Sequence, residues 1–299
     1  MRTRTTSLTY TIQGHQFQAP ALVAGLYLVA TPLGNLADVS LRSLAVLAAA
    51  DLVLCEDTRI TSRLLQRYSI EAHLKPYHDH NAATVRPGLL EQLGSGAAIA
   101  LVSDAGMPMV SDPGYKLVRD CVEHDIAVDV VPGPTAPVTA LALSGLPSDR
   151  FMFAGFLSAK SGARLRQLRE LSAIPATLLL FESAARIKLS LEAIAEVMGN
   201  RPVAVAREMT KLHQEVLRGD AAGILAQLAD RPALKGEISI VIGPPADDAH
   251  VSEEDLSARL SELLRDHPAS KAAAILAKQT GQPRAALYDL AVSLKTAGS

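Results

Sequence analysis

The chain has 299 residues, of which 48% are hydrophobic and 20% are charged, so it can bury a sizeable core and is not a disordered chain. Its 29 Lys and Arg against 31 Asp and Glu leave a net charge of −2, which excludes a globally basic nucleic-acid coat but allows a local basic patch. Two cysteines exclude a disulfide framework, and no apolar run is long enough to cross a bilayer, so we expect a soluble, cytoplasmic protein with reduced thiols.

Short apolar runs alternate with helical patterns along most of the chain, which is typical of α/β folds. Residues 1–24 come first; they lack the apolar segment of a secretory signal and are expected to form a mobile extension. Strands are predicted at 26–30, 52–55, 99–102, 128–131, 151–154, 177–181, 203–206 and 238–242. Helices are predicted at 41–50, 59–68, 83–93, 115–124, 136–143, 163–171, 186–198 and 223–229. Unbroken apolar runs such as 176–181 suit strands covered on both faces, so mainly parallel sheets are expected.

Turn-forming residues divide the chain into units. The Ser-Gly-Leu-Pro segment at 144–147 predicts one α/β domain at 25–146 and a second at 147–245. Residues 252–299 follow as a helical module, with helices predicted at 253–266, 269–279 and 284–295. This module has six basic and six acidic residues, so a packing or partner surface is favoured over a DNA-binding helix–turn–helix.

Gly- and Pro-rich loops follow three of the predicted strands, at 30–38, 102–114 and 131–136, and each precedes a helix. This places them at the carboxyl ends of strands, where open α/β sheets bind ligands. Glycine lets main-chain N–H groups approach a ligand, and proline stiffens the loop. The P-loop, the dinucleotide fingerprint, the nucleophile elbow and the H-E-x-x-H helix are all missing from the sequence, which disfavours the enzyme classes that depend on them.

Short motifs in a fixed order connect the chain with a known family. They read TPLGNLAD (31–38), CEDTR (55–59), LVSDAG (101–106), SDPG (111–114), VPGPT (131–135), FES (181–183), REMTKLH (207–213) and GEI (236–238). Together they resemble the tetrapyrrole-methylase superfamily of S-adenosylmethionine enzymes, also called class III methyltransferases, and within it the cytidine 2′-O-methyltransferases of 16S ribosomal RNA. The chain departs from the family pattern at Ala184, where proline is usual, and at Met107 and Val110, where threonine and isoleucine are usual.

The resemblance implies two α/β domains with S-adenosylmethionine in the cleft between them. It implies a cofactor site formed by Pro32, Gly34, Asp104, Ala105, Gly106, Met109, Val110, Ser111, Thr135 and Ala136. For Met109 and Val110, packing in the core is an equal alternative. A homodimer and a 16S rRNA or small-subunit substrate are implied by the resemblance only, and no DNA or membrane partner is expected.

A ribose hydroxyl is a poor nucleophile, so a nearby carboxylate acting as a base would help the methyl transfer. Asp57, Glu182 and Glu208 lie at or just beyond predicted strand ends and are candidates for this base. Each is equally suited to a structural ion pair with a neighbouring arginine.

The densest basic stretch holds the candidate RNA contacts Lys160, Arg164, Arg166 and Arg169, for which a solvated helix face is the alternative. With 5 Phe, 6 Tyr and no Trp for base stacking, a structured RNA is favoured over a free single strand. No metal is expected at the histidines near position 78, because transfer from a sulfonium needs none. Two other functions stay open: a tetrapyrrole (precorrin or sirohaem) C-methyltransferase and a non-catalytic binding module.

Overall fold

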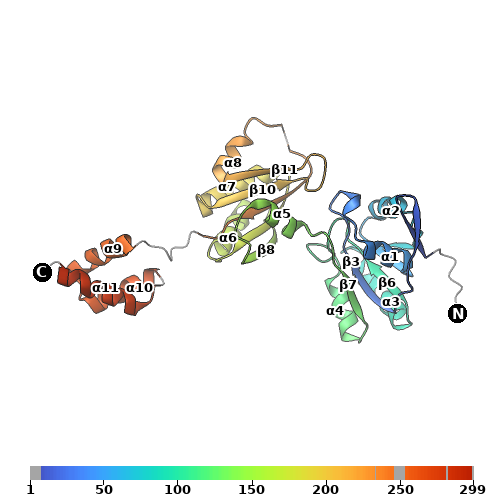
Figure 1. The fold of residues 1–299 in the computed structure, drawn as a ribbon, viewed down its shortest axis with the longest axis horizontal. Coiled ribbons are helices and arrows are strands. Elements are labelled where there is room, and N and C mark those ends of the chain that lie inside the picture. Colours follow the sequence, from blue (N-terminus) through green and yellow to red (C-terminus); the bar gives the residue numbers. More distant parts are fainter. Residues whose placement is uncertain (1–7, 233, 246–252, 281, 298–299) are drawn as a thin grey trace.

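The computed structural model describes residues 8–232, 234–245, 253–280 and 282–297. Two α/β units and a helical module follow one another along the chain (Figure 1). The α/β class that the sequence predicts is therefore confirmed.

The first unit is built on a five-stranded sheet with the order β5–β4–β6–β3–β7 and parallel pairing throughout. Its strands are β3 (Gly25–Val29), β4 (Leu52–Cys55), β5 (Leu74–Pro76), β6 (Ala98–Leu101) and β7 (Val128–Val131). Its helices are α1 (Leu41–Ala49), α2 (Thr58–Arg67), α3 (Ala82–Gly94), α4 (Tyr115–Glu123) and the short 3₁₀ helix η1 (Leu36–Asp38). Helices α1 and α2 share one apolar cluster with Tyr27 and Val29, whereas α3 and α4 share another with Leu26 and Leu28. The sheet is therefore covered on both faces, as its unbroken apolar runs predict.

A β-hairpin stands where the sequence predicts a mobile extension, so that prediction is wrong for this segment. Strands β1 (Thr9–Ile12) and β2 (His15–Gln18) pair antiparallel, and the Thr11 N–H donates to the Tyr68 carbonyl at 2.7 Å. The turn is made by Gln13 and Gly14, whose φ angles of 50° and 84° suit a two-residue hairpin loop. Apolar side chains of the hairpin pack on the first core, which explains its fixed position.

The second unit has the strand order β11–β10–β12–β9–β8. Its strands are β8 (Phe151–Phe156), β9 (Thr177–Ser183), β10 (Pro202–Arg207), β11 (Glu215–Asp220) and β12 (Glu237–Ile242). Only β8 and β9 pair in parallel, so the expectation of a mainly parallel sheet is wrong here. The physical reason lies in the connections. The chain reverses between β10 and β11, so these two neighbours are antiparallel. Strand β12 runs in the same direction as β11 and lies between β10 and β9, so it is antiparallel to both.

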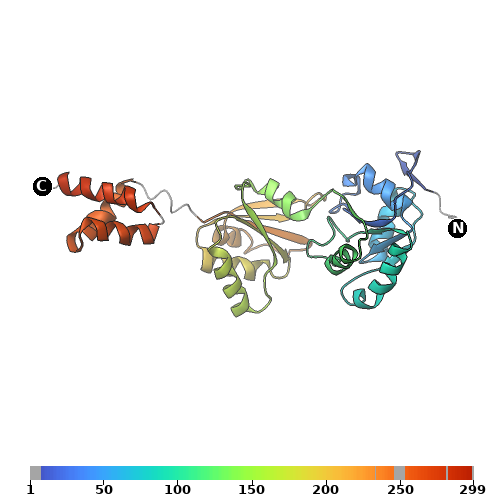
Figure 2. The ribbon, with the colours of Figure 1, turned by 90° about the horizontal axis from the view of Figure 1, so that it is seen from below.

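Helices cover this second sheet on both faces (Figure 2). One face carries α6 (Ser161–Ser172), α7 (Ile187–Met198) and α8 (Ala221–Gln227), and the other carries α5 (Ala136–Ser144). Helix α5 begins directly after the loop that leaves β7, yet its Ala140 and Leu141 pack on Leu179 and Val241 of the second sheet. By packing, the second unit thus begins at α5, ahead of the boundary at 146/147 that the sequence predicts.

The last three helices are α9 (Glu253–Asp266), α10 (Ala269–Thr280) and α11 (Arg284–Ala297). They enclose a small apolar core of their own that includes Leu260, Leu276 and Leu287. Throughout the described residues, no helix combines the length and the hydrophobicity that a bilayer span requires.

Candidate functional site

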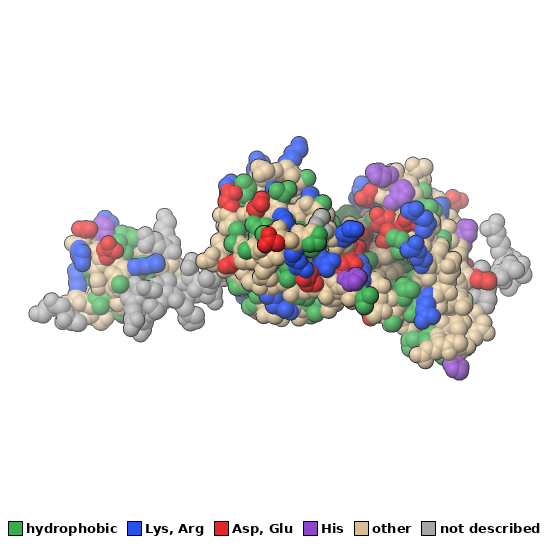
Figure 3. All heavy atoms as spheres, turned by 90° about the horizontal axis from the view of Figure 1, so that it is seen from above, with side chains coloured by type: hydrophobic (Ala, Val, Ile, Leu, Met, Phe, Trp, Pro, Cys, Tyr) green, Lys and Arg blue, Asp and Glu red, His purple; other side chains and the backbone are tan. Residues whose placement is uncertain are grey.

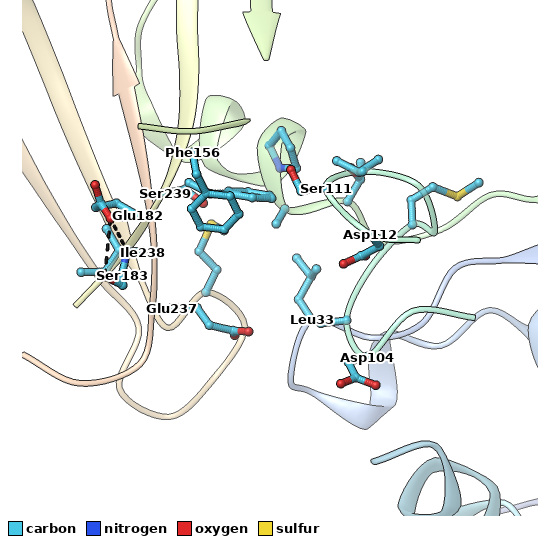
Figure 4. Close-up of a pocket in the computed structure, with 18 of the residues that line it drawn as sticks. Leu33, Asp104, Ser111, Asp112, Phe156, Glu182, Ser183, Glu237, Ile238 and Ser239 are labelled. Atoms are coloured by element: carbon cyan, nitrogen blue, oxygen red, sulfur yellow. Dashed lines mark hydrogen bonds between the residues drawn. The ribbon is translucent and has the colours of Figure 1, made fainter. Parts of the chain in front are cut away.

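A cleft of about 400 Å³ lies between the two α/β units (Figure 4). The first unit contributes the loops after β3 and β6, and the first residues of α5 form the neighbouring wall. The second unit contributes the ends of β8 and β9, the start of β12 and Met209. The carboxyl ends of parallel strands in the first sheet thus face the second unit, as the positions of the Gly- and Pro-rich loops indicate.

The lining of this cleft is acidic and apolar. Among the described residues that line it, four are carboxylates, Asp104, Asp112, Glu182 and Glu237, and none is Lys, Arg or His. Figure 3 shows acidic side chains gathered where the two units meet. The remaining walls include Leu33, Val110, Phe156 and Phe181. Such a cleft suits a ligand that carries positive charge on an otherwise apolar body.

Two of these carboxylates hold their protons more tightly than usual. Burial, together with the charges of Glu56, Asp104 and Glu237, raises the pKa of Asp112 to about 6, against a hydrogen bond from Ser103. Burial also raises the pKa of Asp104, against a hydrogen bond from the Asp57 N–H. A bound cation would relieve the repulsion that raises these pKa values.

A second hollow, of about 460 Å³, adjoins the cleft and shares Asp104 with it. Its other lining residues are Glu56, Asp57, Thr58, Arg59, Pro76, His78 and His80. The Asp57 N–H donates to Asp104 Oδ1 at 3.0 Å, which fixes the Asp104 side chain at the junction of the two spaces.

Six of the ten predicted cofactor residues line the cleft: Asp104, Ala105, Val110, Ser111, Thr135 and Ala136. Gly106 does not, because its N–H and carbonyl are both engaged with the backbone of Thr31 at 3.1 and 2.9 Å. Its main chain is therefore used within the fold, contrary to the expectation that it lines the second loop for the ligand.

The remaining three predicted cofactor residues also lie off the cleft lining. Pro32 is buried in the first loop, and Met109 packs on Gly114, where an added Cβ would lie 3.1 Å from Met109 Cγ. Met109 is 36% exposed, so it contacts the Gly114 backbone without being buried in the core. Gly34 lies under the side chain of Lys211 from the second unit, so it contributes to the contact between the units.

Of the three candidate bases, Glu182 alone lines the cleft, and its carboxylate is already occupied. The residue is 3% exposed, and its carboxylate accepts hydrogen bonds from the Ser183 N–H at 2.8 Å, from Arg186 Nε at 2.8 Å and from Ser190 Oγ. These contacts join the end of β9 to the start of α7. Glu182 is thus a structural ion-pair partner, the alternative that the sequence left open.

Asp57 and Glu208 lie outside the lining of the cleft. Hydrogen bonds from the Arg59 side chain and N–H lower the pKa of Asp57 to about 2, which makes it a weak base. Burial alone would raise the pKa of Glu208, but hydrogen bonds from Lys211 and the Glu237 N–H lower it below its usual value. Both carboxylates are therefore held in ion pairs.

The predicted RNA contacts divide into exposed and buried residues. Lys160, Arg166 and Arg169 are exposed on α6 or at its start. Arg164 is 6% exposed, and its guanidinium donates to the carbonyls of Ser158 and Ala159, so it cannot reach a phosphate as we expected. Helical spacing alone does not reveal this, because it does not show which face packs on the sheet.

Asp112 and Glu237 are functional candidates that the sequence argument missed. Both stand in motifs quoted above, SDPG and GEI, at the end of a loop or the start of a strand. The available signal was a carboxylate beside a strand-end loop. His78 and His80 have their ring centroids 6.0 Å apart, and within the described ranges no three His, Cys, Asp or Glu side chains are grouped to hold a metal ion.

Comparison with known proteins extends these observations. A family model described as tetrapyrrole (corrin/porphyrin) methylases matches residues 25–225, and one described as the RsmI C-terminal HTH domain matches residues 250–295. A protein of Mesorhizobium japonicum named ribosomal RNA small subunit methyltransferase I is 48% identical, over 94% of this chain and 96% of its own. A protein of Erythrobacter litoralis with the same name is 46% identical, over 94% and 99%.

Solved structures show the same fold at low identity. A diphthine synthase superposes with a TM-score of 0.58 and 17% identity, covering 73% of this chain and 89% of its own. A uroporphyrin-III C-methyltransferase from Thermus thermophilus, complexed with S-adenyl homocysteine, has a TM-score of 0.51 and 19% identity, covering 73% and 96%. The chain belongs to the tetrapyrrole methylase family, in the group of the ribosomal RNA small subunit methyltransferase I proteins.

Proposed function

We propose that the protein transfers the methyl group of S-adenosylmethionine to the 2′-hydroxyl of a cytidine ribose in 16S rRNA of the small ribosomal subunit. The observation that carries this is the cleft between the family's two units, whose lining, in the part of the chain that the structure describes, has four carboxylates and no basic side chain. The names of relatives that match along nearly the whole chain favour ribosomal RNA as the acceptor.

The cleft fits S-adenosylmethionine by its chemistry. The cofactor supplies a methyl group on a cationic sulfur, and it also carries a cationic amino group. Asp104 would offset part of this charge, and Phe156 and Phe181 would contact the cofactor's apolar parts. Thr135 precedes α5 without a side-chain hydrogen bond to the first turn. The N–H groups at the start of this nine-residue helix are thus suited to donate hydrogen bonds to the carboxylate or to a ring nitrogen of the cofactor.

The protein's own residues must bring the acceptor hydroxyl in line with the donor and keep water away. The second hollow beside Asp104 offers the entry for the ribose, because it opens next to the cleft. Lys160, Arg166 and Arg169 would contact RNA phosphates from the second unit.

A second copy of the chain is a further part of the proposal. Strand β8 is an edge strand, and its Phe151 and Met152 are 47% and 39% exposed. Exposed apolar side chains on an unpaired edge favour a contact with another copy. Light scattering of the purified chain should give twice the monomer mass, and Phe151→Lys should return it to one. Because its proposed substrate is the ribosomal subunit, we place the protein in the cytoplasm.

The test of the activity is incubation with methyl-labelled S-adenosylmethionine and, in parallel, small subunits, free 16S rRNA or a tetrapyrrole such as uroporphyrinogen. We expect label in RNA, and mass spectrometry of the digest should show 2′-O-methylcytidine. Label found only in the tetrapyrrole would refute the RNA acceptor, and no label together with no cofactor binding would favour a binding module.

The cofactor site has its own test by calorimetry. Asp104→Ala should weaken binding of S-adenosylmethionine by at least about tenfold, because it removes a carboxylate from the cleft. Asp129→Ala is the matched control, because Asp129 pairs with Arg42 on the surface and does not line the cleft. Equal affinities in the two variants would contradict the site.

A further inference from the structure

Methylation of a hydroxyl needs a group that accepts its proton, and the cleft offers four carboxylates for that task. Three of them already have partners. Glu182 is buried against Arg186, Glu237 Oε2 accepts from Lys211 Nζ at 2.7 Å, and Asp104 accepts from the Asp57 N–H. In the described parts of the chain, Asp104 and Asp112 form no ion pair with Lys or Arg. They differ in their hydrogen-bond donors: Asp104 is held by the main-chain N–H of Asp57, whereas Asp112 accepts from the Ser103 hydroxyl.

Asp112 also has the position that the task requires. Figure 4 shows its carboxylate directed into the cleft from the first unit, with Glu237 on the opposite side. It lies close enough to Glu56, a lining residue of the second hollow, and to Asp104 to feel both charges. Asp112 lines the cleft together with Asp104, and Asp104 also lines the second hollow, from which an acceptor would approach the donor.

The loop that carries Asp112 is held in one conformation. Ser111 before it has a φ of 67°, Pro113 follows it, and Gly114 has a φ of 141° with Leu101 and Met109 against it. Left-handed conformations at non-glycine residues persist where the surrounding structure enforces them, and they are frequent at active sites. The backbone thus fixes the direction in which the Asp112 side chain leaves the loop.

We propose that Asp112 is the catalytic base that accepts the proton of the ribose 2′-hydroxyl. The proposal rests on the proposed function. As the oxygen–carbon bond to the methyl group forms, the carbon–sulfur bond breaks and its electron pair stays on sulfur. The hydroxyl proton passes to a carboxylate oxygen of Asp112, which later releases it to water.

The titration of Asp112 agrees with this role. Burial and the charges of Glu56, Asp104 and Glu237 raise its pKa to about 6, with the Ser103 hydroxyl as the opposing hydrogen-bond donor. A base with a pKa just below neutrality is ionised at cellular pH and still accepts a proton better than an ordinary aspartate. Asp57, with a pKa of about 2, lacks this property.

The test is single-turnover methylation of small subunits at saturating labelled S-adenosylmethionine, between pH 5.5 and 8.5. For the wild type we expect a rate that rises with pH and then levels off, with a midpoint no higher than about 6, because the bound cationic donor lowers the pKa of Asp112. Asp112→Asn should lower the rate at least about 100-fold and abolish this pH dependence, whereas Asp112→Glu should restore part of the rate. Binding of S-adenosylhomocysteine, measured by calorimetry, should stay within about threefold of the wild type in both variants. Asp129→Asn is the control for an unrelated loss of charge.

Two results would overturn the assignment. One is an Asp112→Asn rate close to that of the wild type. The other is a loss of S-adenosylhomocysteine affinity as large as the loss of rate, which would make Asp112 a cofactor ligand. A wild type that methylates no RNA would refute the proposed function itself. An active wild type with an equally active Asp112→Asn variant would refute only the role of Asp112, so the two failures can be told apart.

Discussion

The side chain of Lys211 in the second unit lies directly across Gly34 in the first. A Cβ added to Gly34 would come within 2.4 Å of Lys211 Cε and 2.6 Å of Lys211 Cγ. The same lysine donates from Nζ to Glu208 at 3.0 Å and to Glu237 at 2.7 Å. Because Glu237 lines the cleft, the contact at Gly34 ties the spacing of the two units to the position of a cleft carboxylate.

The first prediction concerns this contact. Gly34→Ala should force Lys211 aside at a cost of about 1–3 kcal/mol, typical of overpacking. Part of that cost should appear as weaker cofactor binding, because the two walls of the cleft move apart; we expect a loss of about tenfold in S-adenosylhomocysteine affinity by calorimetry.

Gly162→Ala is the matched control, because in the described chain an added Cβ there would meet nothing within 4 Å beyond its two neighbouring residues and the backbone of its own helix. Its affinity should equal that of the wild type. A Gly34→Ala variant that also binds like the wild type would show that the cleft does not depend on this contact.

The second prediction separates a structural role of Glu182 from a catalytic one. Glu182→Gln removes the charge that pairs with Arg186, whose side chain is 29% exposed. We expect a stability loss of about 2 kcal/mol, below the usual cost of breaking a fully buried pair because Arg186 retains access to water. Thermal unfolding checks this, with Glu196→Gln as the control, since Glu196 is 59% exposed and 3.8 Å from Arg169. A variant as stable as the wild type but 100-fold slower in methyl transfer would instead support Glu182 as the base.

Much of the fold could be predicted because its strands are short, continuous apolar runs. The strand at Leu52–Cys55 and the helix at Glu253–Asp266 have the predicted bounds. The missed strand Glu215–Asp220 lies at a sheet edge; it mixes charged and apolar residues, has no long apolar run, and is only partly buried. The reversed direction of β12 was also out of reach, because an apolar run is the same for either direction.

The sequence predicts the region of the site, but it does not show which polar groups there are available to a ligand. Strand-end loops indicated the cleft, and six of the cofactor residues line it. Which polar groups remain for a ligand depends on pairings distant in sequence, such as Thr31 with Gly106. The same holds for carboxylates: Asp112 stands out because burial and the charges of Glu56, Asp104 and Glu237, which are distant in sequence, raise its pKa.

The third prediction concerns RNA binding by the exposed residues of the basic stretch. Lys160→Ala and Arg166→Ala should each weaken binding to small subunits and reduce the slope of log affinity against log salt by about 1. Filter binding over a salt series measures this. Arg42→Ala is the control. Arg42 is a surface cation of the first unit, where it pairs with Asp129, and its removal should leave the slope unchanged. Unchanged slopes for both Lys160 and Arg166 variants would mean that RNA contacts another surface.

The fourth prediction is a gain of stability on removing the charge of Asp112. Its pKa is raised from 3.8 to about 6 in the folded chain, so the folded state disfavours the ionised form. This penalty is absent below about pH 3.8, grows as the pH rises and is complete above about pH 6. Asp112→Asn should therefore stabilise the protein at pH 8 and change little near pH 4.

The expected gain is about 1 kcal/mol, because Asp112 is partly exposed and the full shift must be discounted for solvent screening. For a chain of this size, that corresponds to an increase of about 2 °C in Tm. Scanning calorimetry at the two pH values measures it, with Asp129→Asn as a control that should give no gain at either. A group that costs stability and yet is needed for methyl transfer fits the usual conflict between stability and activity at a catalytic site. A lower Tm for Asp112→Asn at pH 8 would show that the carboxylate stabilises the fold, and the repulsion argument for Asp112 would then be wrong.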